Sequence, residues 1–208
     1  MSKTAHVNQN YIHACDGQRA KLESCRRPLT EIYDGHDLRE IIRFYLLQAP
    51  ISKDNNKQGA SPIRSLGELG WRGNAELSKL ERSLLASSDI PSFVMLGSNA
   101  ITNTLKAMDL DGEICTEHPR AVLQRPTKVV LNEDGSTSKS PSESRMSCLF
   151  RHVRNSIAHS GTYVFYDKTV LLEDRNGIGG QNDITARILI RKQTLLDWIE
   201  IVEGKERS

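Results

Sequence analysis

The stretch of residues 148–160 has the spacing of an amphipathic helix, which fixes how this part of the chain must pack. With about 100° between successive residues, one side of the helix is apolar. That side consists of Leu149, Phe150, Val153 and Ile157. A second stripe is polar and consists of His152, Asn155, Ser156 and His159. Ser142 or Ser144 begins the helix and Gly161 stops it, so we predict a helix at about residues 143–160.

The polar residues of this helix are types that suit acid–base chemistry on a phosphate. His159 titrates near neutrality and can give or take a proton. Arg154 offers a permanently charged fork for phosphate oxygens, and Asn155 can orient either group. Arg154 lies about 140° around the helix from His159, so the two side chains do not share one face ideally. The alternative interpretation is a solvated polar face without catalytic function.

The string Arg154-Asn-Ser-Ile-Ala-His159 resembles the Arg-x4-6-His motif of the HEPN superfamily (higher eukaryotes and prokaryotes nucleotide-binding). The wider string from Arg151, followed by a strand-like stretch and a closing helix, resembles small stand-alone HEPN nucleases of plasmids and bacterial defence loci. The resemblance covers about residues 145–202. It implies a mainly α fold, namely a HEPN-like antiparallel helical bundle with a small β-hairpin before the C-terminal helix.

The same resemblance implies a metal-independent endoribonuclease that cuts RNA through attack of the 2′-OH, acting as a toxin or phage-defence effector. His159 would transfer the proton, Arg154 would stabilise the phosphate charge and Asn155 would orient both. Four residues are candidates for binding the RNA: His152, Arg151, Ser156 and Arg145. The assignment of His152 rests on its place in the polar stripe and not on the family motif. No cofactor and no metal site are expected.

Acid–base catalysis on both sides of a phosphodiester needs two proton-transfer groups, whereas one chain supplies a single His159. HEPN proteins share a site between protomers, so we expect a homodimer whose interface includes the 145–160 helix, with RNA as the substrate. One alternative is a non-catalytic HEPN subunit that binds nucleotide, RNA or a partner. Another is the toxin partner of a nucleotidyltransferase antitoxin. Those toxins carry Tyr two residues after the His, where this chain has Gly161 and the nearest Tyr is Tyr163.

Composition limits the class of protein. The 208 residues carry a formal net charge of only +2, so any contact with nucleic acid must come from a local basic patch. The basic side chains of the motif helix form one such patch. The four cysteines contain no CxxC pair, which predicts reduced cytosolic thiols and no zinc ribbon. No apolar run is long enough to cross a membrane and the first residues lack a signal core, so we expect a cytoplasmic protein without membrane contact.

The remaining pattern predicts an N-terminal arm or short helix at 1–35 and a single HEPN-like helical domain at 36–208. Helices are expected from Asp37, from Asn74, and from Phe93 or Ser98 to Leu110. Residues 112–141 predict a long loop that borders the site, with one short strand at 127–131. A hairpin at about 162–190 and a helix at about 192–203 close the chain. The glycines of the hairpin connector, Gly177, Gly179 and Gly180, fit a turn better than a phosphate loop.

Overall fold

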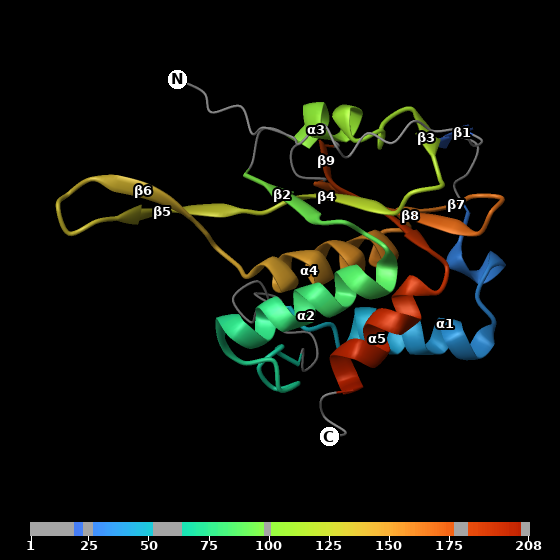
Figure 1. The fold of residues 1–208 in the computed structure, drawn as a ribbon, viewed down its shortest axis with the longest axis horizontal. Helices are drawn as coiled ribbons and strands as arrows, with labels where there is room; N and C mark the ends of the chain where they lie inside the picture. Colours follow the sequence, from blue (N-terminus) through green and yellow to red (C-terminus); the bar gives the residue numbers. More distant parts are fainter. Residues whose placement is uncertain (1–18, 23–26, 52–63, 98–100, 177–182, 205–208) are drawn as a thin grey trace.

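The computed structural model describes residues 19–22, 27–51, 64–97, 101–176 and 183–204. Their centre is a five-stranded sheet in the order β2-β4-β9-β8-β7 (Figure 1). Its strands are β2 (Phe93–Leu96), β4 (Arg120–Gln124), β7 (Thr162–Val164), β8 (Thr169–Asn176) and β9 (Asp183–Arg191). β2 pairs with β4 in parallel, and the other pairs are antiparallel. The sheet therefore combines segments from the middle and the end of the chain.

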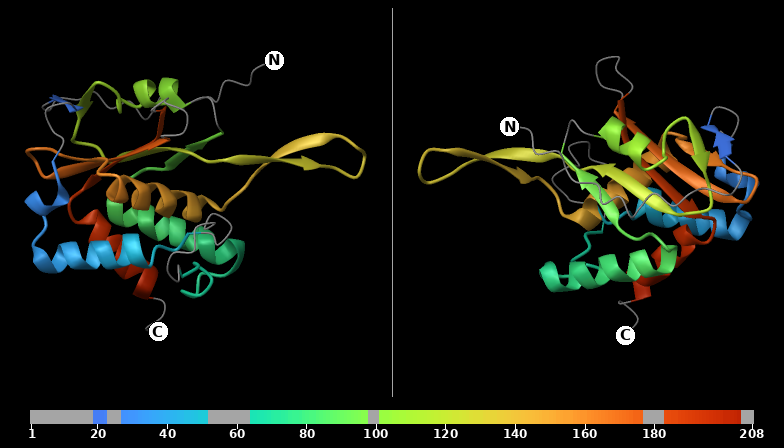
Figure 2. Two further views of the ribbon diagram at one scale, coloured as in Figure 1. Left: turned by 180° about the vertical axis from the view of Figure 1, so that it is seen from behind. Right: turned by 45° about the horizontal axis from the view of Figure 1, so that its top comes forward.

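Helices cover one face of this sheet (Figure 2). They are α1 (Gly35–Ile41), the π-helix η4 (Ile42–Leu47) that continues it, α2 (Gly73–Ser88), α4 (Arg145–Ala158) and α5 (Thr194–Gly204). The buried sheet residues on this side alternate along each strand, as the pleat requires. They include Ala121, Leu123, Val170, Leu172, Ala186, Ile188 and Ile190. This helical layer and the sheet enclose the larger core.

The other face of the sheet carries a second, smaller core. It is covered by α3 (Ile101–Ala107) and by the two-stranded sheet of β1 (Arg19–Lys21) and β3 (Glu113–Cys115). Leu171 and Leu189, which alternate with the residues of the first core, face this side together with Val122. Because both faces are covered, the central strands contain continuous apolar runs at residues 121–123, 170–172 and 188–190.

A hairpin of β5 (Thr127–Leu131) and β6 (Thr137–Pro141) projects away from these layers (Figures 1 and 2). It connects β4 to α4 and has no strand on either outer edge within the described chain. We call residues 127–141 the arm. At its root, Ser142 donates its backbone N–H to Pro126 O over 3.0 Å, and Ser144 then caps α4 by accepting from Ser147 N–H. The arm therefore leads directly into the motif helix.

The expected mainly α, HEPN-like helical bundle is wrong. The described residues form an α/β fold in which five α-helices accompany a mixed five-stranded sheet. The predicted hairpin at 162–190 is instead three strands, β7, β8 and β9, within this sheet. The physical reason is that β4 joins the sheet beside β9, a pairing between residues more than sixty positions apart that no local pattern records.

Two local predictions also differ from the structure. Residues 93–96 form strand β2, so the third helix is shorter than expected and spans only Ile101–Ala107. Residues 112–141, expected to be a loop with one strand, contain the four strands β3 to β6. The glycines Gly177, Gly179 and Gly180 lie outside the described residues. None of the described helices combines the length and apolar character needed to span a bilayer.

The cysteines also depart from the expectation of reduced thiols. Cys115 is disulfide-bonded. Cys148 is free and buried in the helical core. Burial, with Glu143 nearby, raises the pKa of the Cys148 thiol to about 12. At neutral pH this thiol is protonated and does not act as a nucleophile.

Candidate functional site

Helix α4 lies between strand β8 and the π-helix η4, and this position decides which of its side chains reach solvent. Leu149, Phe150 and Val153 are fully buried, as the apolar stripe predicts. Phe150 packs against Phe44 and Tyr45 of η4, with ring centroids 6.1 Å and 6.4 Å away. The helix is therefore held on both sides, and only a narrow strip and its C-terminal end stay accessible.

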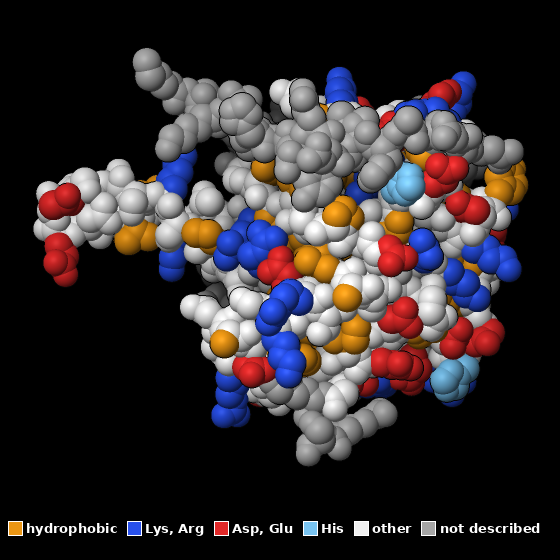
Figure 3. Space-filling view, viewed as in Figure 1, with side chains coloured by type: hydrophobic (Ala, Val, Ile, Leu, Met, Phe, Trp, Pro, Cys, Tyr) orange, Lys and Arg blue, Asp and Glu red, His pale blue; other side chains and the backbone are white. Residues whose placement is uncertain are grey.

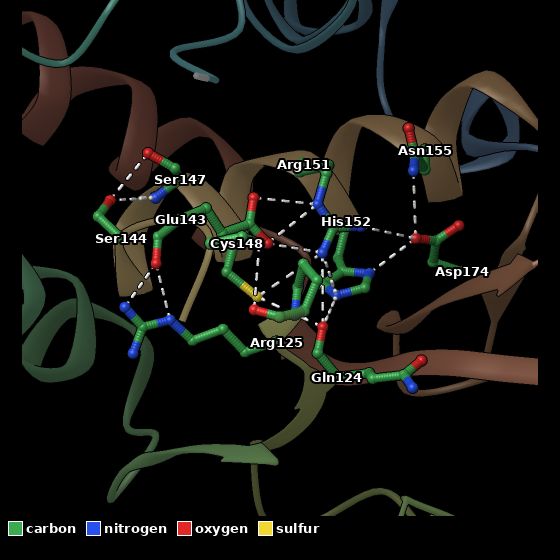
Figure 4. Close-up of polar contacts among 12 residues, drawn as sticks. Gln124, Arg125, Glu143, Ser144, Ser147, Cys148, Arg151, His152, Asn155 and Asp174 are labelled. Atoms are coloured by element: carbon green, nitrogen blue, oxygen red, sulfur yellow. Dashed lines mark hydrogen bonds and ion pairs between the residues drawn. The ribbon is translucent and has the colours of Figure 1, made fainter. Parts of the chain in front are cut away.

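Most of the predicted polar stripe faces the sheet instead of solvent, and Figure 4 shows His152 and Asn155 turned towards Asp174. His152 is fully buried, and its Nδ1 lies 2.7 Å from Asp174 Oδ2 on β8. A carboxylate only accepts, so Nδ1 carries the proton. Asn155 donates its side-chain amide to the same oxygen of Asp174 over 3.2 Å. Ser156 is also fully buried and donates to His152 O over 2.8 Å.

The second ring nitrogen of His152 is also engaged. Nε2 lies 2.8 Å from Gln124 O and 3.1 Å from Arg151 Nη2, so it donates to the first or accepts from the second. With both nitrogens occupied and no exposed surface, His152 cannot reach an RNA bound at the surface. His152 and Ser156 therefore contribute to the packing of α4 against the sheet and are too deeply buried to contact a substrate.

Two arginines of α4 are neutralised by carboxylates. Arg145 pairs with Glu81 of α2 over 2.7 Å and donates to Phe93 O. Arg151 pairs with Glu143 over 2.8 Å. Burial of Arg151 opposes its charge, but hydrogen bonding and attraction to Glu143 outweigh this effect and raise its pKa. The basic patch expected from the sequence is therefore largely compensated within the chain.

Arg154 and His159 have different surroundings. Arg154 is half-buried, forms no ion pair with a described residue, and its Nε is buried without a hydrogen-bond partner in the described part of the chain. His159 is exposed at the C-cap of α4, where its backbone N–H donates to Asn155 O over 2.9 Å. The structure thus brings Asn155 to Asp174, whereas Arg154 and His159, the basic groups of the motif, have no carboxylate partner within the described ranges.

The turn after His159 is fixed by close backbone packing. Ser160 adopts a left-handed conformation with φ 56°. A Cβ on Gly161 would lie 2.0 Å from Glu173 O, and the backbone of Gly161 accepts from Glu173 N–H over 2.7 Å. The sequence indicated Gly161 only as a helix stop, whereas the structure requires it for contact with β8. The end of α4 that carries His159 is therefore rigidly placed.

A groove of about 380 Å³ lies beside this end of α4. Its lining includes Ile157 and Ser160, from α4 and the turn after it, and Leu38 and Ile42, from α1 and η4. Thr30 and Thr162 add hydroxyl groups to its wall. The groove is mostly apolar, and Arg27, the charged residue in its lining, is paired with Glu31 over 3.1 Å, so the groove offers little uncompensated charge for a phosphate.

On the opposite face of the sheet, sequence reasoning missed a buried ionic cluster. Glu173 of β8 pairs with Arg187 over 2.7 Å and with Arg175, and it accepts from Tyr163 Oη over 3.0 Å. Burial raises the pKa of Glu173, but its hydrogen bonds to Arg175 and Arg187 outweigh burial and lower the pKa overall. Arg187 also pairs with Asp111 over 2.9 Å. These groups compensate one another beside a cleft of about 630 Å³.

No group of three or more His, Cys, Asp or Glu side chains suited to a metal ion occurs within the described ranges. Comparison of the chain with family models, with curated proteins and with solved structures finds no significant match.

Proposed function

We propose that the chain is a metal-independent endoribonuclease whose catalytic residues are Arg154, His159 and Asn155. The observation that carries this proposal is the contrast among the basic residues of α4. Arg145 and Arg151 are paired with carboxylates, whereas Arg154 has no such partner among the described residues and His159 is exposed. An uncompensated guanidinium and an accessible imidazole in the same segment suit a phosphodiester.

The proposed reaction begins when His159 removes the proton from an RNA 2′-OH. The 2′ oxygen then attacks the neighbouring phosphorus while the bond from phosphorus to the 5′ oxygen breaks. The products are a 2′,3′-cyclic phosphate and a 5′-OH end, and the leaving oxygen must receive a proton from a second acid. Arg154 stabilises the charge on the phosphate oxygens. Asp174 holds the amide of Asn155, so that its carbonyl oxygen points away from Asp174, free to orient Arg154 or the substrate (Figure 4).

The second acid has no candidate on the same helix, because His152 is buried. We propose that His159 of a second copy supplies the proton, at a composite site formed where the C-terminal ends of two α4 helices meet. Such a two-fold arrangement presents the same residues twice. A cell that produces an active nuclease of this kind should grow slowly, and an antitoxin protein is a natural partner for it.

One observation favours an alternative function. Each chain exposes a single imidazole on α4, which is enough to bind RNA, a nucleotide or a partner protein but not enough for acid and base together. In this alternative the protein is a non-catalytic binding subunit of a toxin–antitoxin pair. It predicts RNA binding without cleavage.

The first test is incubation of the purified chain with RNA in excess chelator, with analysis of the product ends. We expect 2′,3′-cyclic phosphate ends and no cleavage of DNA, which lacks the 2′-OH. His159→Ala and Arg154→Ala should each lower the cleavage rate by roughly a hundredfold. The matched control is His36→Ala, which removes an exposed imidazole on α1. Wild-type cleavage by His159→Ala would refute the assignment, and activity that requires magnesium would refute the mechanism.

A further inference from the structure

The arm leaves apolar surface uncovered. No helix or strand of the described chain packs along it, and the side chains of Val129 and Leu131 are 66% and 72% exposed. Figure 3 shows the arm standing clear of the body, with acidic side chains at its end. A two-stranded hairpin is at best marginally stable in water, and a third strand or an apolar covering is usually needed. The arm therefore has the properties of an element that another strand completes.

The hydrogen bonds at the two ends of the arm show which backbone groups point outward. Asn132 donates to Ser136 O over 2.8 Å, and Ser142 donates to Pro126 O over 3.0 Å. Hydrogen-bonded and non-hydrogen-bonded pairs alternate along an antiparallel ladder. The even-numbered residues of β5 therefore bond to β6. The N–H and C=O groups of the odd-numbered residues point away from it, and these residues are Thr127, Val129 and Leu131.

The two outer edges of the arm differ. On β6 the outward-pointing residues are Thr137, Lys139 and Pro141. Pro141 has no N–H to donate, and lysine and proline are residues that protect an edge from pairing. The outward positions of β5 contain neither residue type. The edge of β5 is therefore the open one.

We propose that β5 pairs with β5 of a second copy, antiparallel, about a two-fold axis at Val130, so that two arms form one four-stranded sheet. An antiparallel pair of identical strands has the symmetry of a two-fold dimer. The axis stands perpendicular to the sheet, so the same face of both arms lies on the same side. Outward-pointing residues then meet outward-pointing residues, and Val129 of each copy lies opposite Leu131 of the other.

This register also places matching chemistry together. Val129 and Leu131 of both copies form one continuous apolar strip, and the two Val130 side chains meet at the axis. An axis at Val129 would instead set Lys128 against Val130. With the axis at Val130, Lys128 at the root of one arm lies opposite Asn132 near the tip of the other, and Thr127 lies opposite Glu133. This register therefore pairs apolar residues with apolar residues and sets no charged side chain opposite an apolar one.

The charge of the arm favours a second copy over RNA as the partner. Lys128 and Lys139 are balanced by Glu133 and Asp134, so the arm has no net charge. Binding along a phosphate backbone depends on excess positive charge, which the arm lacks. The apolar strip instead resembles the core of a protein interface.

This inference does not depend on the proposed catalytic function. The arm adjoins the N-terminal end of α4, whereas His159 follows its last residue. The 14 residues of α4 separate the two ends by about 20 Å. Pairing through the arms therefore uses a surface different from the composite site.

The first test compares two proline variants of the full chain by sedimentation equilibrium. Val129 and Lys139 lie opposite each other in one non-hydrogen-bonded pair, so Val129→Pro removes an outward N–H from β5 and Lys139→Pro removes one from β6. We expect a wild-type mass that is an even multiple of 23.3 kDa. Val129→Pro should halve this mass, because it weakens the pairing of the two β5 strands about tenfold or more. Lys139→Pro should leave the mass unchanged.

The proposal is overturned if the wild type is a single chain at tens of micromolar, or if Val129→Pro keeps the wild-type mass. A loss of mass with Lys139→Pro alone would assign the pairing to the other edge and also overturn it. Circular dichroism of both variants checks that the body keeps its fold.

The second test measures the register with a disulfide. Residues that face each other in a non-hydrogen-bonded pair have Cα atoms about 4.5 Å apart, within the range that a disulfide spans. Val130→Cys should therefore form a two-chain species on a non-reducing gel. In the matched control, Ser138→Cys, the two thiols lie about three strand spacings apart, or about 14 Å, and should form none, as should the wild type. Cross-linking through Ser138→Cys but not through Val130→Cys would refute the register.

Discussion

At the scale of single residues, burial separates side chains that the helical spacing places together. His152 and His159 lie on one predicted stripe, yet the first is fully buried against Asp174 and the second is exposed. The difference arises because α4 ends at Ala158, so His159 is beyond the part of the helix that the sheet covers. His152 therefore joins α4 to the sheet, whereas the ring of His159 is accessible from solvent.

The structural role of His152 gives a stability prediction. His152→Ala leaves the buried carboxylate of Asp174 without its closest partner and opens a cavity beside β8. We expect the free energy of unfolding to fall by about 3–5 kcal/mol. Urea denaturation measures this change, and His36→Ala, which alters an exposed ring, should show almost none. Equal midpoints for the two variants would mean that the contact between His152 and Asp174 contributes little.

The sequence could not predict that His152 is buried and His159 exposed, because the partners of His152 are far away along the chain. Gln124 lies 28 residues before it and Asp174 lies 22 residues after it. The spacing correctly placed Leu149, Phe150 and Val153 in the core, since their apolar character needs no specific partner. It placed His152 and Ser156 on a polar face, since a polar side chain that is satisfied inside the protein has the same sequence pattern as one in water.

At the scale of secondary-structure elements, helices were easier to predict than strands. The stretches that begin near Asp37, Asn74 and Ser144 are helical because their apolar residues recur every three or four positions. Strand β4 spans only five residues and is buried on both faces, so it lacks the alternation that marks a half-exposed strand. Strand β2 is a four-residue apolar run, which has the same pattern as the start of a helix. The central sheet therefore depends on pairings that the sequence does not display.

The ionic cluster between β8 and β9 should make stability depend on pH. Glu173 has a lowered pKa in the folded chain, so its ion pairs stabilise the fold above its ordinary value of 4.5. This contribution is lost as the pH falls through the lowered pKa. Glu173→Gln should therefore be less stable than the wild type by about 3–5 kcal/mol at pH 7, because it leaves Arg187 buried without its carboxylate.

The difference between Glu173→Gln and the wild type should shrink as the pH falls below 4.5 and through the lowered pKa of Glu173, because the wild-type carboxyl is then increasingly protonated. Thermal unfolding at a series of pH values measures it. Asp183→Asn removes an exposed carboxylate at the start of β9 and is the matched control. A pH-independent gap between Glu173→Gln and the wild type would show that shape, and not charge, explains the loss.

At the scale of the whole molecule, two surfaces at opposite ends of α4 are proposed to join copies of the chain. The composite site requires contact near His159, whereas the arms meet beyond the other end. The two contacts can form independently, and together they would build a closed assembly or an open chain of copies, depending on the angle between their axes.

Cleavage measurements can separate the two contacts. Val129→Pro should cleave RNA at the wild-type rate per chain, because the arm lies about 20 Å from His159. If the site is composite, the rate per chain of this variant should fall on dilution in step with the fraction of paired chains measured by sedimentation. A monomer that keeps full activity would require the second proton donor to lie within one chain.

The neighbouring carboxylates Glu173 and Asp174 also affect the register in which β8 pairs during folding. Residues 170–172 are Val-Leu-Leu, and both faces of the sheet are apolar, so a slip of one residue would cost little in hydrophobic burial. A slip in one direction would put Leu172 in the place of Glu173 beside Arg187. A slip in the other direction would put Arg175 in the place of Asp174 beside His152. The two acids therefore specify the register of β8, which its apolar residues alone do not.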